Sequence, residues 1–176
     1  AWRAYSTGPD ADVLIGPEFK PFYEMDRGQD LGVTSWPPDA WKMGGGTVWG
    51  WISYDPELDL FYYGTGNPGS WNPDQRPGDN KYSMTIFARN PDTGKAVWAY
   101  QKTPHDAWDY DGINESILVD LTIEGKKVPA LVHFDRNGFA YTLDRTNGDL
   151  LVAKPYDPDL NWSTGVEMDK SKPNYG

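Results

Sequence analysis

A strand–turn–strand pattern occurs twice in this chain, and this repeat restricts the fold more than any other feature of the sequence. Residues 87–98 read FARNPDTGKAVW, and residues 141–152 read YTLDRTNGDLLV. In each copy a polar turn with a glycine separates two strand-like runs, and the two glycines, Gly94 and Gly148, lie 54 positions apart. This spacing is typical of a four-stranded blade of a β-propeller, although a meander or a β-sandwich gives a similar pattern. At that spacing the 176 residues supply about three blades of a larger ring.

The composition agrees with an all-β fold. The chain contains 19 Gly and 15 Pro, and 15% of its residues are aromatic, which disfavours long helices and favours short strands joined by turns. We expect residues 1–43 to be irregular, with at most a short helix near 10–14, and residues 161–176 to form a loop. The blades are expected within residues 44–160, so that residues 1–176 form one partial propeller domain. Turn chemistry and β-branched or aromatic content predict strands over residues 48–54, 58–64, 82–89, 96–101, 116–122, 128–135, 138–144 and 150–155.

The balance of charges and the missing motifs argue against several classes of partner. Lys and Arg total 16 against 26 Asp and Glu, and the net charge of -10 repels the phosphate backbone of nucleic acids. No apolar run approaches the roughly 18–20 residues that span a membrane. The chain has no cysteine, no nucleotide-binding glycine motif and no zinc-ligand spacing. Because it lacks an initiator Met and ends in a polar run, we expect it to be a piece of a larger protein.

The segment 108–112 reads WDYDG and places two carboxylates two residues apart beside an indole. In an extended segment, residues i and i+2 point to the same side, so Asp109 and Asp111 are expected to face one point. Two like charges this close are unfavourable unless a cation or a shared proton lies between them, and a hard metal ion with oxygen ligands suits that place. A carboxylate left partly free beside the metal would act as a base. The alternative, that one or both aspartates cap a turn before Gly112, stays open.

Two glycine-rich segments hold further candidate ligands. Asn67 follows a predicted strand in the run GTGNPG, where its amide oxygen is a neutral ligand for a hard cation, although Asn-Pro is equally a turn starter. The run GGGTVWGW, residues 44–51, is expected to place Trp49 and Trp51 on one face of a strand. One indole would then form the floor of a pocket for a planar ligand, while the other packs between sheets. Thr47 would hydrogen-bond the edge of that ligand.

Other polar residues allow both a functional and a structural interpretation. Arg136 lies between two predicted strands, where its guanidinium would bind a carboxylate or a quinone oxygen, or pair with Asp135 in a turn. His105 and Asp106 are the residue types of a catalytic dyad, but no suitable Ser or Cys nucleophile accompanies them, so we do not expect one. His133 lies in a predicted strand and is expected to be a satisfied core histidine.

Several of these runs together resemble the quinoprotein alcohol dehydrogenases, and especially the large subunits of pyrroloquinoline quinone (PQQ)-dependent methanol dehydrogenases. The resemblance extends from Ala1 to about residue 159 and rests on residues 44–51, 60–68, 76–81, 103–106 and 108–114. It implies an all-β, eight-bladed propeller with the quinone in a funnel near the axis. This chain would be an internal portion of that ring.

The resemblance also implies roles for individual residues. Trp49 matches the tryptophan on which the quinone ring stacks, and Thr47 matches a threonine that hydrogen-bonds the cofactor. Arg136 matches the arginine that contacts the quinone oxygens and the catalytic base. Asn67 matches an amide ligand of the metal, and Asp109 matches the aspartate assigned as the base at that metal.

Asp111 distinguishes two branches of this family. Where the calcium-dependent enzymes usually carry a small residue, the lanthanide-dependent branch carries an aspartate as an extra metal ligand. A trivalent ion gains more from an additional anionic oxygen and is the stronger Lewis acid, so the resemblance favours a lanthanide, with calcium as the alternative. The family's metal-ligating glutamate and adjacent-cysteine disulfide have no counterpart here, since Glu18 and Glu24 do not lie in the glutamate's motif.

The implied activity is the oxidation of methanol and other primary alcohols to the aldehyde, with PQQ as cofactor and a c-type cytochrome as electron acceptor. The resemblance further implies a periplasmic enzyme that is a homodimer at full length. We expect this chain alone to be inactive, because it cannot build a complete site. Two other interpretations stay open, namely a calcium-dependent quinoprotein with a different range of alcohols and a non-catalytic propeller that serves as an interaction platform.

Overall fold

The structure, a computed structural model, describes residues 1–170. Residues 171–176, which belong to the loop expected at 161–176, lie outside the described residues. The helical turns are α1 (Asp10–Val13), η1 (Glu24–Asp26), α2 (Leu31–Thr34), η2 (Ala40–Met43) and η3 (Pro73–Gln75). The strands are β1 (Ile52–Asp55), β2 (Leu60–Gly64), β3 (Thr85–Arg89), β4 (Ala96–Gln101), β5 (Ser116–Ile123), β6 (Lys126–Phe134), β7 (Phe139–Asp144) and β8 (Leu150–Pro155).

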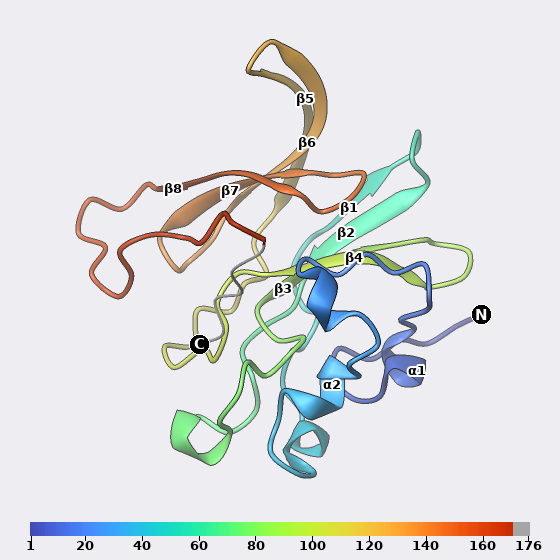
Figure 1. The fold of residues 1–176 in the computed structure, drawn as a ribbon, viewed down its shortest axis with the longest axis vertical. Helices are drawn as coiled ribbons and strands as arrows, with labels where there is room; N and C mark the ends of the chain where they lie inside the picture. The colour runs from blue at the N-terminus through green and yellow to red at the C-terminus, as the bar shows by residue number, and fades with distance from the viewer. Residues whose placement is uncertain (171–176) are drawn as a thin grey trace.

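The strands form two four-stranded antiparallel sheets, in the orders β1-β2-β3-β4 and β5-β6-β7-β8 (Figure 1). Each sheet is a meander, in which every strand pairs with the next one along the chain. The predicted all-β fold is confirmed, but the described residues contain two blades rather than about three. The number is lower because residues 1–51 form loops and helical turns, and because residues 65–84 connect β2 to β3 without a strand.

The boundaries of the strands agree best with the prediction in the second strand of each repeated hairpin. The strands predicted at 96–101 and 150–155 correspond to β4 and β8 at both ends. The largest difference is at residues 48–54, because β1 begins only at Ile52 and the preceding residues lie outside the ladder. The N-terminal part holds four short helical turns before residue 44, instead of one at most. None of the helices in residues 1–170 is long and apolar enough to cross a membrane.

The sequence repeat corresponds to equivalent hairpins in the two sheets. Residues 87–98 run from β3 into β4, and residues 141–152 run from β7 into β8. In both hairpins the register of the strands shifts shortly before the turn. Gly94 and Gly148 have φ values of +72° and +76°, and each N–H donates to the carbonyl four residues earlier, at 2.9 and 2.8 Å. The two turns therefore have the same geometry, which glycine permits without strain.

A tryptophan joins the two sheets. Trp98 of β4 is fully buried, and its ring would lie 2.8 Å from a Cβ placed on Gly148 in the second sheet. Its Nε1 donates to the backbone carbonyl of Arg145 at 3.0 Å. Trp2 makes the same kind of contact with the first sheet, because its ring packs on Gly94 and its Nε1 donates to the same turn at 2.7 Å. The contact thus recurs at both equivalent turns.

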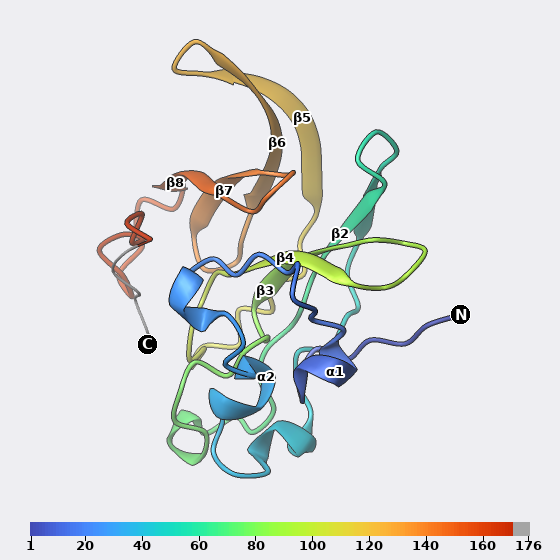
Figure 2. The same cartoon turned by 45° about the vertical axis from the view of Figure 1, so that its right-hand side comes forward.

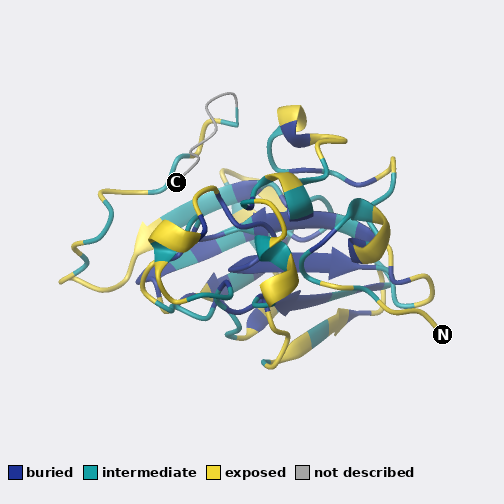
Figure 3. Cartoon of the chain, turned by 90° about the horizontal axis from the view of Figure 1, so that it is seen from below, coloured by how far each residue is buried: buried dark blue, intermediate teal, exposed yellow. Residues whose placement is uncertain are grey.

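The core lies between the sheets and beneath the N-terminal segment. Figure 3 shows buried residues along the central strands, whereas the helical turns around them are mostly exposed or intermediate. A second cluster fills the space between the first sheet and the N-terminal segment, which runs beside β4 in Figure 2. The cluster between the two sheets includes the fully buried Tyr62, Trp98, Leu131, Tyr141 and Leu143.

Candidate active site

The loop that connects β4 to β5 carries both aspartates of the predicted metal site. Asp109 and Asp111 have φ values of +63° and +66°, so the segment is not extended, contrary to the prediction from sequence. Aspartate tolerates this left-handed conformation better than most residues. The two carboxylates nevertheless interact, since the charge of Asp109, after burial, raises the pKa of Asp111. The convergence therefore comes from the fold of the loop and not from strand geometry.

Glycines allow this loop to approach the strands closely. A Cβ on Gly64, the last residue of β2, would lie 2.0 Å from the carbonyl oxygen of Gly112. A Cβ on Gly50 would lie 2.1 Å from the carbonyl oxygen of Ile113. Both distances are too short for any side chain, so glycine at these two positions determines how deeply the loop sits against the first sheet.

Three of the predicted site residues meet around Gly66. A Cβ on Gly66 would lie 3.2 Å from Trp49 Nε1 and 3.7 Å from Asp111 Oδ1. The backbone N–H of Gly66 donates to the carbonyl of Thr47 at 3.0 Å. Trp49 is 58% exposed and Trp51 is 68% exposed, so the expectation that one of the two indoles packs between sheets is wrong for this chain.

Asn67 and Asp109 line one small cavity of about 80 Å³. The side-chain amide of Asn67 donates through Nδ2 to the carbonyl of Pro68 at 3.3 Å, which leaves the amide oxygen on the other side of the group. The structure therefore brings the predicted amide ligand and one of the two predicted carboxylate ligands to one cavity. The remaining walls include Trp71, Arg76 and Trp108. Arg76 and Trp108 stand in the runs 76–81 and 108–112 but were assigned no role from the sequence, and Trp71 stands in no motif.

The loop between β4 and β5 that carries Asp109 and Asp111 is called the aspartate loop. Arg136, in the turn after β6, faces this loop from the second sheet. Its Nη1 donates to Oδ2 of Asp111 at 2.6 Å, so its partner is this carboxylate and not Asp135. The guanidinium lowers the pKa of Asp111, but burial and the Asp109 charge outweigh it, and the pKa of Asp111 is raised in the balance. Asp111 is thus a carboxylate that gains from an additional cation.

His105 and Asp106 do not form a catalytic dyad, and none was expected from the sequence. His105 Nδ1 lies 3.0 Å from the carbonyl oxygen of Gly78, and Asp106 Oδ1 accepts a hydrogen bond from the backbone N–H of Trp108 at 3.1 Å. Asp106 is 1% exposed, and its Oδ2 has no hydrogen-bond partner within the described part of the chain. Burial raises the pKa of this carboxyl group.

A buried network lies behind the aspartate loop. Lys102 directly follows β4 and pairs with Asp135, which directly follows β6; both side chains are fully buried. His133 is a satisfied core histidine as predicted, with Nδ1 3.1 Å from the carbonyl oxygen of Glu115 and Nε2 2.9 Å from Nζ of Lys102. Although burial opposes it, the charge of the neighbouring Lys102 holds the pKa of Asp135 well below its usual range. In the sequence, the expected core position of His133 and the position of Asp135 beside Arg136 pointed towards this network, whereas nothing pointed to Lys102.

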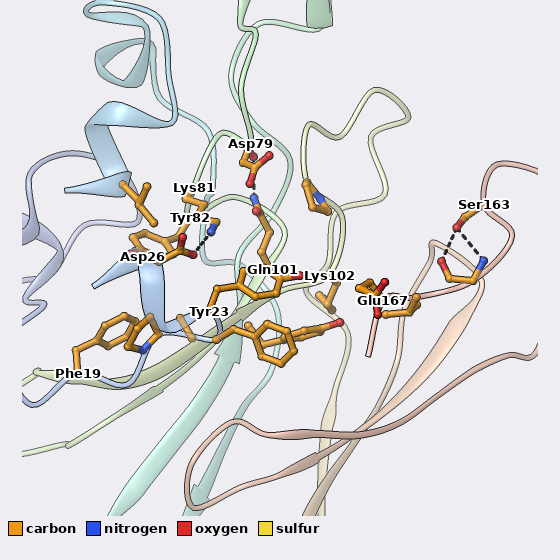
Figure 4. Close-up of a pocket in the computed structure, with 18 of the residues that line it drawn as sticks. Phe19, Tyr23, Asp26, Asp79, Lys81, Tyr82, Gln101, Lys102, Ser163 and Glu167 are labelled. Atoms are coloured by element: carbon orange, nitrogen blue, oxygen red, sulfur yellow. Dashed lines mark hydrogen bonds and ion pairs between the residues drawn. The ribbon is translucent and has the colours of Figure 1, made fainter. Parts of the chain in front are cut away.

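A second cavity, of about 100 Å³, lies between the N-terminal segment and residues 163–167 (Figure 4). The ion pair of Asp26 and Lys81, at 2.7 Å, lies on one side, and Ser163 and Glu167 lie on the other. None of the site residues predicted from the sequence lines this cavity. Two of the predicted residues, Asn67 and Asp109, instead line the smaller cavity.

The donor atoms of the predicted metal ligands are of the kind that a hard cation binds, but there are too few of them. The amide of Asn67 and the carboxylates of Asp109 and Asp111 are oxygen ligands, and a cation would relieve the repulsion between the two carboxylates. Within residues 1–170, no three His, Cys, Asp or Glu side chains are grouped to hold a metal. Since such an ion takes about six to eight oxygen ligands, a complete site needs further ligands from elsewhere.

Comparisons with known proteins give consistent findings. Residues 18–154 match the PQQ family described as glucose/ethanol/alcohol dehydrogenase, β-propeller domain. The chain is 59% identical over 175 residues to the lanthanide-dependent methanol dehydrogenase of Methylorubrum extorquens, covering 99% of this chain and 29% of that protein. It is 51% identical over 176 residues to methanol dehydrogenase (cytochrome c) subunit 1 of Paracoccus denitrificans, covering 98% and 27%.

A solved structure gives the same result. A protein described as a europium-containing methanol dehydrogenase matches with a TM-score of 0.90 at 57% identity, and the match covers 96% of this chain. It covers 29% of the other chain. The chain therefore spans less than a third of the length of these relatives.

Proposed function

This chain belongs to the PQQ family of glucose/ethanol/alcohol dehydrogenase β-propellers, and on that premise we propose that the full-length protein oxidises methanol and other primary alcohols to aldehydes. The proposal includes PQQ as cofactor, a lanthanide ion as Lewis acid and a c-type cytochrome as electron acceptor. It is supported by the identity to proteins named lanthanide-dependent methanol dehydrogenase and methanol dehydrogenase (cytochrome c). A periplasmic location and a homodimer are proposed from the sequence resemblance alone.

The position of Asp111 is the observation that carries this proposal. Its Oδ1 faces the glycine that also contacts the Trp49 indole, and its Oδ2 pairs with Arg136. Asp111 thus adds a second carboxylate to the ligands offered by Asp109 and Asn67. Because the Coulomb energy between an ion and a carboxylate grows with the charge of the ion, the additional anion favours a trivalent over a divalent metal.

Each residue has a defined task in the proposed site. When bound, the quinone supplies the two-electron oxidant and the metal ion supplies the Lewis acid. The indole of Trp49 supports the quinone ring, Thr47 hydrogen-bonds its edge, and Arg136 contacts its oxygens. Asp109 accepts the hydroxyl proton of the alcohol. The cavity beside Asp109, at about 80 Å³, is suited to a short alcohol.

The test is methanol turnover by the full-length protein, reconstituted with PQQ and either calcium or a light lanthanide. We expect turnover with the lanthanide to exceed turnover with calcium. Asp109→Ala should abolish turnover with both metals, because the base is lost, whereas Asp111→Ala should abolish only the lanthanide-dependent rate. Asp12→Ala, which changes an exposed aspartate of α1, is the matched control and should keep the wild-type rate.

Three outcomes would contradict the proposal in different ways. Full lanthanide-dependent turnover by Asp111→Ala would show that the metal is wrongly assigned. Faster turnover with calcium than with a lanthanide would favour the calcium-dependent alternative. A full-length protein that binds neither metal nor quinone would favour the non-catalytic propeller.

A further inference from the structure

The buried ammonium group of Lys102 connects three parts of the chain. It donates to the carbonyl oxygen of Gly112 at 2.6 Å, lies 2.9 Å from Nε2 of His133, and pairs with Asp135. An ammonium group has three N–H donors, so all three are used. His133 then accepts through Nε2, while its Nδ1 donates to the carbonyl of Glu115 at 3.1 Å. The side chains of Lys102, His133 and Asp135 are all 0% exposed.

Two of these contacts hold the loop that carries the aspartates. Gly112 directly follows Asp111, and Glu115 is the last residue before β5. Asp109, Asp111 and Gly112 all have positive φ, at +63°, +66° and +41°. A backbone with several left-handed residues persists only where the surrounding structure supports it. The hydrogen bond from Lys102 to the Gly112 carbonyl supplies such support directly after Asp111.

The third contact reaches the opposite wall of the site. Asp135 immediately precedes Arg136, and its Oδ1 accepts a hydrogen bond from the backbone N–H of Asn137 at 3.0 Å. The side chain of Asn137 donates to Thr103 Oγ1 at 3.0 Å, and Thr103 directly follows Lys102. The residues on both sides of Arg136 are therefore tied to the beginning of the aspartate loop.

The geometry points to Lys102 as the positioning residue that places Asp109 and Asp111 for the metal ion before the ion binds. This inference rests on the proposed function, since it concerns the same metal site. Lys102 makes no contact with either carboxylate and acts through the Gly112 carbonyl and through Asp135. The alternative is that Lys102 only neutralises Asp135 in the core. The two alternatives predict different metal affinities for a variant in which the charges of Lys102 and Asp135 are both removed.

The test measures Tb³⁺ binding to the quinone-free full-length protein, by terbium emission sensitised by nearby indoles, together with the midpoint of thermal unfolding. Lys102→Met leaves Asp135 buried without its partner, so it should lower the midpoint and weaken Tb³⁺ binding. The double variant Lys102→Met/Asp135→Asn removes both charges and should recover most of the midpoint. Its affinity for Tb³⁺ should stay about ten- to a hundredfold weaker than wild type. A double variant that recovers both midpoint and affinity would overturn the inference.

Lys81→Met is the matched control. Lys81 also forms a buried ion pair with an aspartate, Asp26, at 2.7 Å, but this pair joins the N-terminal segment to the loop before β3. We expect a lower unfolding midpoint with wild-type affinity for Tb³⁺. An equal loss of affinity in Lys81→Met would overturn the inference, because any lost ion pair in the core would then loosen the site.

A second measurement needs no variant, so it can be made even if neither Lys102 variant folds. It tests whether the aspartate loop is ordered before the metal ion binds. In the wild-type protein, the amide of the buried Gly112, which donates to the carbonyl of Tyr110 at 2.9 Å, should be protected from hydrogen exchange before Tb³⁺ is added, and the ion should add little protection. Fast exchange that slows only on addition of Tb³⁺ would overturn the inference, because the ion would then order the loop. The proposed function fails separately, if the wild-type protein binds no Tb³⁺ or if Asp111→Ala binds it equally well.

Discussion

Arg136 donates a hydrogen bond of 2.6 Å from Nη1 to Oδ2 of Asp111. The bond joins the turn after β6 to the loop after β4, so it spans the two sheets across the candidate site. It places a guanidinium beside a carboxyl group whose pKa is raised by burial and by Asp109. In the metal-free protein the guanidinium stabilises the Asp111 carboxylate, and it competes there with any other cation.

Arg136→Met should therefore separate metal binding from quinone binding. Removing one positive charge beside the site reduces the repulsion of a metal ion, so Tb³⁺ affinity in the quinone-free full-length protein should become about two- to fivefold tighter. Loss of the guanidinium should lower the PQQ content of the purified protein, measured by the absorbance of the released cofactor. Arg27→Met removes an arginine paired with Glu24 on the surface and should change neither quantity. Weaker binding of both Tb³⁺ and PQQ in Arg136→Met would contradict the conclusion that Arg136 competes with the metal ion for Asp111.

Metal binding should weaken as the pH falls. Burial and the charge of Asp109 raise the pKa of Asp111, so a proton competes with the cation at a less acidic pH than at an ordinary aspartate. Titration of the full-length protein with Tb³⁺ at several pH values should show affinity falling through that raised pKa. Asp111→Asn should bind more weakly and show a flatter pH dependence. The same pH dependence in both proteins would mean that another group is responsible.

Asp106→Asn should stabilise the metal-free protein at neutral pH. Asp106 is 1% exposed, and burial raises the pKa of its carboxyl group. The folded state therefore binds the proton more tightly than the unfolded state, and stability is lost as the pH rises through the raised folded-state pKa. We expect a gain on the order of 1 kcal/mol near neutral pH, seen as a higher midpoint of thermal unfolding, which disappears in acid. A gain that is equal at both pH values would show that ionisation is not the cause.

Gly64→Ala should displace the aspartate loop. The new Cβ would lie 2.0 Å from the carbonyl oxygen of Gly112, and a backbone atom cannot move aside as a flexible side chain can. We expect a loss of about 1–3 kcal/mol in the free energy of unfolding and at least about tenfold weaker Tb³⁺ binding. Gly16→Ala, which meets nothing within 4 Å, is the control and should leave both unchanged. Normal Tb³⁺ binding by Gly64→Ala would show that the depth of the loop is unimportant.

Gly148→Ala should destabilise the protein more than Gly125→Ala. Both glycines have positive φ, at +76° and +79°, so both alanines carry a similar backbone penalty, on the order of 1 kcal/mol. Only a Cβ on Gly148 meets another group, the ring of Trp98 at 2.8 Å, whereas nothing lies within 4 Å at Gly125. Urea unfolding should show an additional loss of about 1–3 kcal/mol for Gly148→Ala. Equal losses would show that Trp98 does not depend on this close approach.

The hairpins were predictable from sequence because each strand pairs with its neighbour in the chain. The turn residues around Gly94 and Gly148 therefore carry the information on pairing locally. The number of blades was overestimated because repeat spacing assigns every residue to a blade. Residues 1–51 and 65–84 instead form connections and covering loops, which have no period that would reveal them.

The members of the candidate site were predictable, but their arrangement was not. Asp109 and Asp111 stand in a recognisable motif, whereas their left-handed backbone depends on contacts with other parts of the fold. The sequence left the partner of Arg136 open between a carboxylate or quinone oxygen at the site and Asp135 in the turn. The choice depends on Lys102, which occupies Asp135 in the core. Lys102 belongs to no local motif, so its burial and its pairing with Asp135 could not be predicted from the sequence.

The position of a lanthanide ion in crystals of the full-length protein tests the account most directly, and anomalous scattering at the absorption edge of the ion gives that position. We predict a peak within coordinating distance of the side-chain oxygens of Asn67, Asp109 and Asp111, on the side of the Trp49 indole. A peak out of reach of Asp111, or no peak at these residues in crystals that contain the ion, would contradict the account.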